Sequence, residues 1–230
     1  VMILAIFILL ILTILFLIIT DSPYPSITTY GFILITTMIF LSTLENITDT
    51  IGLSKESLSL REPISNFGHL MAALIAFFIF ESERDPTTLL FVFIGVLILL
   101  WVNTEKHHLQ LFSNEGTKYF VYGMVLSAII VNIYKAGLEI IDPVWLFFFR
   151  MIGVFILTAI FLRFDVKALT KNQWRYSIYA GIAYFIGSLT YLFSIQYLGL
   201  LTTILLLMLA PASKYIGSYL ILKEHVTTVS

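Results

Sequence analysis

The sequence contains no cysteine and few charged residues, and each shortage excludes a class of function. Without cysteine there is no disulfide framework, no thiolate metal site and no cysteine nucleophile. Only 12% of the 230 residues are Asp, Glu, Lys or Arg, about half the share found in soluble domains. The formal net charge of −1 leaves no basic surface to neutralise phosphates, and there is no glycine-rich phosphate-binding loop. We therefore expect neither a nucleic-acid partner nor direct hydrolysis of ATP.

Long apolar runs take the place of charge, since 59% of the residues are hydrophobic and the mean hydropathy is +0.98. Each run of about 17 to 23 residues is long enough to cross a hydrocarbon core roughly 30 Å thick. The first run has no basic flank and no cleavage site, so it is interpreted as a span and not as a signal peptide. The three tryptophans fall near span ends, where indole side chains are stable. These features predict an all-α, multi-pass transmembrane bundle of about eight helices, at Met2–Thr20, Thr28–Thr48, Glu62–Phe80, Thr87–Asn103, Tyr119–Gly137, Pro143–Arg163, Trp174–Gln196 and Leu200–Leu222.

Two stretches of the chain resemble each other, Gly52–Glu83 and Gly199–Glu224. Each begins with Gly-Leu, has a proline about a dozen residues later (Pro63 and Pro211), continues as an apolar run and closes on glutamate. The two stretches are five predicted spans apart, and every crossing reverses the direction of the chain. The sequence therefore predicts two halves of opposite orientation in the membrane.

The distribution of basic residues agrees with inverted halves. The predicted loop at residues 21–26 has no basic residue, whereas its counterpart in the second half, residues 163–175, is rich in lysine and arginine. Basic residues gather on the cytoplasmic side of a membrane. With Val1 in the cytoplasm, the outer loops and span ends keep only Arg84 and Lys135 as basic residues.

The second half, most clearly residues 118–226, resembles the EamA-domain branch of the drug/metabolite transporter superfamily. The resemblance rests on Asp142-Pro143 followed by Arg150, then a basic loop with Trp174, then the Gly199–Glu224 stretch. It implies ten helices in two inverted five-helix repeats around a central cavity. Members of this family export or exchange metabolites, amino acids, drugs or nucleotide sugars.

In that arrangement residues 1–103 form a first repeat without its first helix, and residues 119–230 form a second repeat without its last helix. Residues 104–118 link the two. The resemblance implies a secondary carrier of small metabolites or drugs in the plasma membrane, with no enzymatic activity, cofactor or metal. A small-molecule substrate and the lipid bilayer are its expected partners, and a proton or a counter-substrate supplies the driving force. The first half departs from the family pattern because it has no counterpart of Arg150.

Ionisable and polar groups at bilayer depth are candidates for function because they are costly there unless they are paired or hydrated. Asn66 and Lys214 both follow a repeat proline by three residues, which predicts that they share one cavity. His69 lies about 60° around the same helix from Asn66. The predicted substrate-cavity residues are Asn66, His69, Asn132, Tyr191 and Lys214, and the predicted proton-coupling residues are Glu45 and His69. An alternative interpretation leaves Glu45 solvated at the membrane interface and His69 in a structural hydrogen bond.

A further set of residues is predicted to bend or gate the helices. A proline frees a backbone carbonyl one turn back, which in lipid needs water or a neighbouring helix. Arg150 is interpreted as a structural or gating contact. The two glutamates that close the repeated stretches are suggested by the resemblance to contact the opposite half. The predicted kink and gate residues are Pro63, Pro211, Arg150, Glu83 and Glu224.

Two alternative functions belong to other classes. A membrane enzyme acting on lipid-linked substrates needs paired carboxylates, a metal or a histidine site near one interface. The segment Glu105 to His108, with its adjacent histidines, is the one cluster of this kind in the sequence. A non-transporting membrane subunit is the other alternative.

Overall fold

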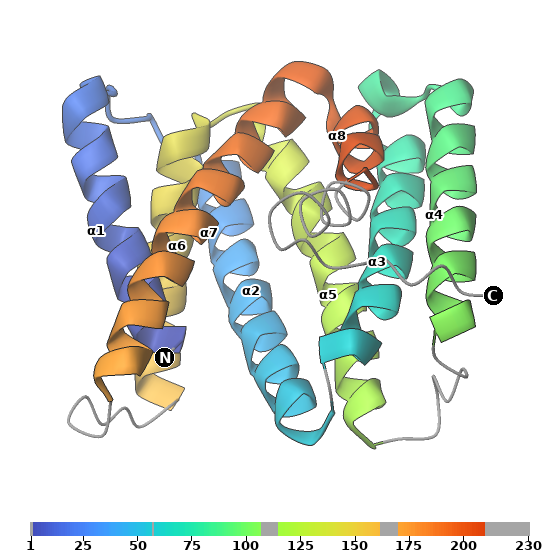
Figure 1. Ribbon diagram of the computed structural model, residues 1–230. Helices are drawn as coiled ribbons and strands as arrows, with labels where there is room; N and C mark the ends of the chain where they lie inside the picture. Colours follow the sequence, from blue (N-terminus) through green and yellow to red (C-terminus); the bar gives the residue numbers. More distant parts are fainter. Residues whose placement is uncertain (1, 57, 107–114, 162–169, 210–230) are drawn as a thin grey trace.

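The computed structural model describes residues 2–56, 58–106, 115–161 and 170–209, and in these residues every regular element is a helix. Successive long helices run in alternating directions across one bundle (Figure 1). This confirms the predicted all-α bundle. The elements are α1 (Met2–Thr20), α2 (Thr29–Lys55), α3 (Leu58–Ile79), the 3₁₀ turn η1 (Glu81–Glu83), α4 (Pro86–Lys106), α5 (Glu115–Leu138), α6 (Pro143–Phe161), α7 (Lys171–Leu198) and α8 (Leu200–Leu207).

Short polar segments set where the helices begin. The Asp142 carboxylate accepts a hydrogen bond from the Val144 backbone N–H at 2.9 Å, and Pro143 occupies the first helical position of α6. Proline is favoured at that position because its fixed φ suits the helix and its missing N–H has no partner there in any case. At the start of α7, Thr170 and Gln173 form a reciprocal capping box. Local sequence therefore fixes these boundaries before any packing is considered.

Helix α2 is longer than the apolar run predicts, because it continues past Thr48 to Lys55. Side-chain hydroxyls of this polar extension bond back to helix carbonyls, as in Thr48 to Glu45 O at 2.9 Å. The extension packs closely on α5, where Gly52 lies against the ring of Phe120. The consequence is that Glu45 lies well inside a helix and not at its end.

Helices α2 and α5 lie at the centre of the bundle, with α1 at one edge and α4 at the other (Figure 1). Helix α1 packs against α6 and α7, and α2 packs against α5 and α6. If the repeat equates α1 with α6 and α2 with α7, the contact of α1 with α7 becomes the contact of α6 with α2, and both are present. Helices α3 and α8 run in opposite directions (Figure 1). Both features agree with inverted halves.

The surface is that of a protein surrounded by lipid. Large apolar side chains such as Ile19, Phe78 and Ile160 are 80%, 72% and 68% exposed, whereas Ser42 and Arg150 are buried. In water, large exposed apolar side chains would be unfavourable, whereas in lipid they are not. Polar side chains in lipid are instead buried, where other parts of the protein provide their hydrogen-bond partners. Among the described helices, α2, α5, α6 and α7 are long and apolar enough to cross a membrane, and α1, α3 and α4 carry shorter apolar stretches. The chain is an integral membrane protein.

Candidate functional site

A cavity of about 360 Å³ lies between the two halves of the chain. Its lining residues come from α1, α2 and α3 of the first half and from α5, α6 and α7 of the second. Side chains of α1 and α6, such as Leu9 and Phe147, make an apolar wall, while α2, α5 and α7 contribute most of the polar groups. The polar and charged lining residues are Glu45, Asn46, Asp49, Arg61, Ser127, Tyr134, Arg150, Tyr184, Ser188 and Tyr191. An apolar chamber with a few converging polar groups is the usual form of a small-molecule site.

Arg150 of α6 is a buried cation that lines the cavity. It is the eighth residue of α6, roughly 11 Å along the helix from its start. Its Nε–H donates to the Ser42 hydroxyl on α2 at 3.1 Å, and its guanidinium carbon lies 5.3 Å from the centre of the Tyr134 ring on α5. These contacts hold the cation between α2, α5 and α6, and its partners come from both halves of the chain. A guanidinium held in this way is stabilised by the aromatic face as well as by the hydrogen bond.

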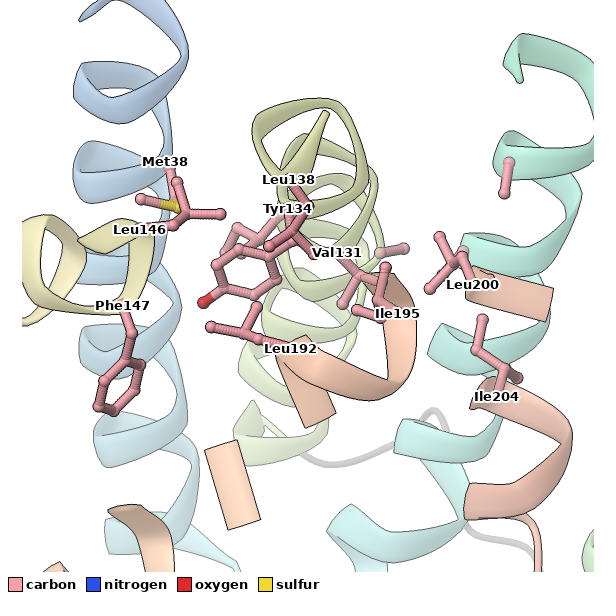
Figure 2. Close-up of a cluster of buried hydrophobic side chains, with 14 of the residues drawn as sticks. Met38, Val131, Tyr134, Leu138, Leu146, Phe147, Leu192, Ile195, Leu200 and Ile204 are labelled. Carbon is pink, nitrogen blue, oxygen red and sulfur yellow. The ribbon is translucent and has the colours of Figure 1, made fainter. Parts of the chain in front are cut away.

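Tyr134 lines the cavity, and its hydroxyl group is buried. The side chain is 5% exposed, and its oxygen has no hydrogen-bond partner in the part of the chain that the structure describes. Figure 2 shows the ring between Leu146 and Leu192, with the hydroxyl directed away from α5. A buried hydroxyl without a partner costs free energy, which a bound molecule or water with a matching polar group recovers. Tyr134 is therefore a strong candidate for contact with a ligand.

The carboxylates of the cavity lie on α2. Asp49 forms an ion pair with Arg61 of α3, and Glu45 lies one turn earlier on the same helix. Glu45, Asp49 and Arg61 also line a second, smaller cavity of about 60 Å³, which His69 of α3 lines as well. The structure thus brings the two predicted proton-coupling residues, Glu45 and His69, to one small cavity that adjoins the main one.

Glu83 lies at the other end of the bundle, where η1 meets the start of α8 (Figure 1). It is 4% exposed. Its two carboxylate oxygens accept hydrogen bonds from the backbone N–H groups of Leu200 and Leu201, at 2.7 and 2.9 Å. The Nζ of Lys135 on α5 lies 3.0 Å from the same carboxylate. Glu83 therefore contacts residues of the second half of the chain.

Other predicted residues lie away from the main cavity. Asn66 and Asn132 are buried but do not line it. Asn132 donates to the carbonyls of Ala72 and Ala128, at 3.1 and 2.8 Å, which is a packing contact between α5 and α3. The structure therefore groups Tyr191 with Glu45 and Arg150, and it separates these three from the two asparagines.

Some predictions fall on residues about which the structure says little. Lys214, Pro211 and Glu224 lie outside the described residues. Pro63 lies within α3, and its side chain is not described. His107 and His108 also lie outside the described residues. Among the residues that the structure describes, no three metal-ligating side chains lie close enough together to hold a metal ion.

Four residues that lie at these sites were not predicted from the sequence: Ser42, Asp49, Arg61 and Lys135. Lys135 could have been predicted from the sequence, because it is a charged residue within an apolar helix, α5. Ser42 could not, since a serine in an apolar helix usually bonds its own backbone. Its role follows only from the position of Arg150, 108 residues later.

Comparison with known protein families matches residues 115–230 to the EamA-like transporter family. The match covers half of the chain and includes α5, α6, α7 and α8. A comparison with curated proteins finds no match.

Proposed function

Since the chain belongs to the EamA-like transporter family, part of the drug/metabolite transporter superfamily, we propose that it is a secondary carrier of small metabolites or drugs. It works by alternating access, in which two inverted halves rock about a site near the middle of the membrane. The plasma membrane is the proposed location.

The arrangement of the helices supports two repeats, at residues 1–103 and 119–230 with residues 104–118 between them. The family match begins at residue 115, close to the proposed start of the second repeat. The cavity takes its walls from both halves, which is where an alternating-access carrier holds its substrate. Its volume of about 360 Å³ suits a metabolite or a small drug.

The observation that carries the proposal is the Tyr134 hydroxyl, buried in the cavity wall without a partner in the described residues. The guanidinium carbon of Arg150, a buried cation, lies 5.3 Å from the centre of the Tyr134 ring. A polar substrate in this cavity supplies a partner for the hydroxyl and a counter-charge for the cation.

The proposed driving force is a proton or a counter-substrate. Glu45 lines both cavities and His69 lines the smaller one. A carboxylate and an imidazole at bilayer depth are the side chains that commonly carry protons in transporters. In this scheme Glu45 holds either a proton or the substrate, and its exchange of one for the other couples the two fluxes.

Tyr134→Phe tests the proposal, because it removes the hydroxyl and keeps the ring under Arg150. The full-length protein is reconstituted in proteoliposomes, and uptake of phenylalanine, ethidium and glucose is measured. For the solute that is carried, we expect Tyr134→Phe to raise the KM by about 2- to 10-fold, as the loss of one hydrogen bond worth roughly 0.5–1.5 kcal/mol predicts.

Tyr122→Phe is the matched control, since Tyr122 is on the same helix and is 60% exposed. It should leave the KM unchanged. Absence of flux for all three solute classes in the unmodified protein would contradict the proposal, as would equal KM values for the Tyr134 and Tyr122 variants.

A further inference from the structure

We infer that Glu83 and Lys135 form a latch that holds the two halves together at one end of the bundle, and that this latch opens once in each transport cycle. The inference rests on the proposed function. It assigns to Lys135 a part in transport, and it defines what Glu83 does.

The contacts of Glu83 join three separate elements. The carboxylate belongs to η1 of the first half, while its partners are the first two backbone N–H groups of α8 and the Nζ of Lys135 on α5. All three partners belong to the second half. The Lys135 side chain is 13% exposed and that of Glu83 is 4% exposed, so solvent screens the pair little.

Gly199 makes this approach of the carboxylate possible. It ends α7 with a φ of +84°, and a Cβ placed there would lie 3.0 Å from the nearer oxygen of Glu83. The backbone therefore turns from α7 into α8 around the carboxylate. The start of a helix attracts a negative charge, so the glutamate caps α8 as well as pairing with the lysine.

The latch and the cavity share two helices. On α5, the latch residue Lys135 directly follows Tyr134, which lines the cavity. On α7, the cavity residue Tyr191 lies two turns before Gly199, and Ile195 fills the space between as a fully buried member of the apolar cluster in Figure 2. A movement of α5 or α7 around a substrate therefore changes the position of the groups that hold Glu83.

The latch lies at the end of the bundle away from Arg61. The cavity extends toward the start of α3, where Arg61 lines it, whereas η1 and the start of α8 lie at the opposite end (Figure 1). In this state the structure closes one end of the path with the latch. Alternating access requires that this end opens, and Glu83 then loses contacts with α8 and Lys135.

These 230 residues contain no cysteine, so a cysteine placed at Ile195 is the only thiol within them. Ile195→Cys is introduced into the full-length protein, alone and together with Glu83→Ala or Lys135→Met. Reaction with a membrane-impermeant methanethiosulfonate reagent is followed in right-side-out and inside-out vesicles. We expect either added substitution to speed labelling about tenfold, from one side only, because about 1.4 kcal/mol of lost contact shifts the closed-to-open ratio tenfold.

Glu81→Ala is the matched control. Glu81 lies two residues before Glu83 in η1, is exposed, and pairs only with Arg84 among the ion pairs of the described residues. It should leave labelling unchanged. Lys135→Met keeps the cap on α8 and removes only the ion pair, so it gives a second result if Glu83→Ala does not fold.

Turnover provides a readout that a purely structural contact would not change. In the Ile195→Cys protein, a gradient of the transported solute should speed labelling, because the latch opens in each cycle. Labelling that ignores the gradient, or that is equal in the Glu83, Lys135 and Glu81 variants, would overturn the latch. Failure of the proposed function looks different: no solute is carried, while labelling still distinguishes Glu83→Ala from Glu81→Ala.

Discussion

Ser42→Ala removes the hydroxyl that holds Arg150 from the opposite half of the protein. Ser42 is fully buried on α2 and accepts the Arg150 Nε–H at 3.1 Å. The guanidinium keeps its place over Tyr134, but the buried Nε–H loses its partner. The substitution is small, so the loss of the hydrogen bond is its main effect.

The expected cost follows from the burial of Arg150, which is 7% exposed. A hydrogen bond to a charged group contributes about 1.5–3 kcal/mol to stability. For a chain of this length each kcal/mol shifts the midpoint of unfolding by about 2–4 °C. Ser42→Ala should therefore lower the Tm by about 3–12 °C.

Thermal unfolding in detergent, followed by tryptophan fluorescence, measures this change. Ser54→Ala is the matched control, because Ser54 is an exposed serine on the same helix whose hydroxyl donates to a local carbonyl, Ile51 O, at 2.7 Å. It should move the Tm by no more than about 1 °C.

A double-mutant cycle separates the hydrogen bond from other effects of the serine. With Arg150→Met in the background, Ser42→Ala should cost almost nothing, because the donor is gone. If Ser42→Ala is equally costly with and without Arg150, or if Ser42 and Ser54 variants unfold together, Arg150 is not held in the way described here.

Two further predictions concern packing and capping. Gly52→Ala should destabilise the protein by about 1–3 kcal/mol, because the new Cβ would lie 2.6 Å from the buried Phe120 ring. Gly187→Ala should be tolerated, because no atom lies within 4 Å of the position of its Cβ. Chemical denaturation of both variants, and of Gly52→Ala combined with Phe120→Leu as a rescue, checks this. Asp85 directly precedes α4, and hydrogen bonds from the Thr88 hydroxyl and the Thr87 backbone N–H lower its pKa. A lowered folded-state pKa means that the carboxylate stabilises the fold above its ordinary pKa and loses that effect as the pH falls through the lowered value. Asp85→Ala should therefore lower the Tm near neutral pH, and the difference from the unmodified protein should shrink as the pH falls below the ordinary pKa of aspartate. A difference that does not depend on pH would contradict the cap.

Much of the fold was predictable because it depends on local properties of the chain. The apolar run at Met2–Thr20 coincides with α1, and the Asp-Pro pair before α6 marks its start correctly. The end of α2 was predicted wrongly, because Asn46 to Gly52 contains residues typical of turns. Packing of Gly52 on Phe120 overrides those preferences, and no local pattern reveals such a contact.

The site was predictable in part. Arg150, Glu45 and Tyr191 were selected because polar groups are rare at bilayer depth, and the structure places all three in one cavity wall. Asn66 and Asn132 satisfied the same criterion but do not line that cavity. Rarity identifies which side chains need partners, and it does not identify the side of the helix on which those partners lie.

The sequence by itself determined that this chain lies in a membrane as helices and belongs to a transporter family, because hydropathy, helix caps and motif order are properties of neighbouring residues. Only the tertiary structure decided that Ser42 holds Arg150, that the buried Tyr134 hydroxyl has no partner among the described residues, and that Glu83 joins α8 to Lys135. These contacts join residues tens to more than a hundred positions apart. Their geometry depends on how the helices rotate and cross, which side-chain packing sets and local sequence does not encode.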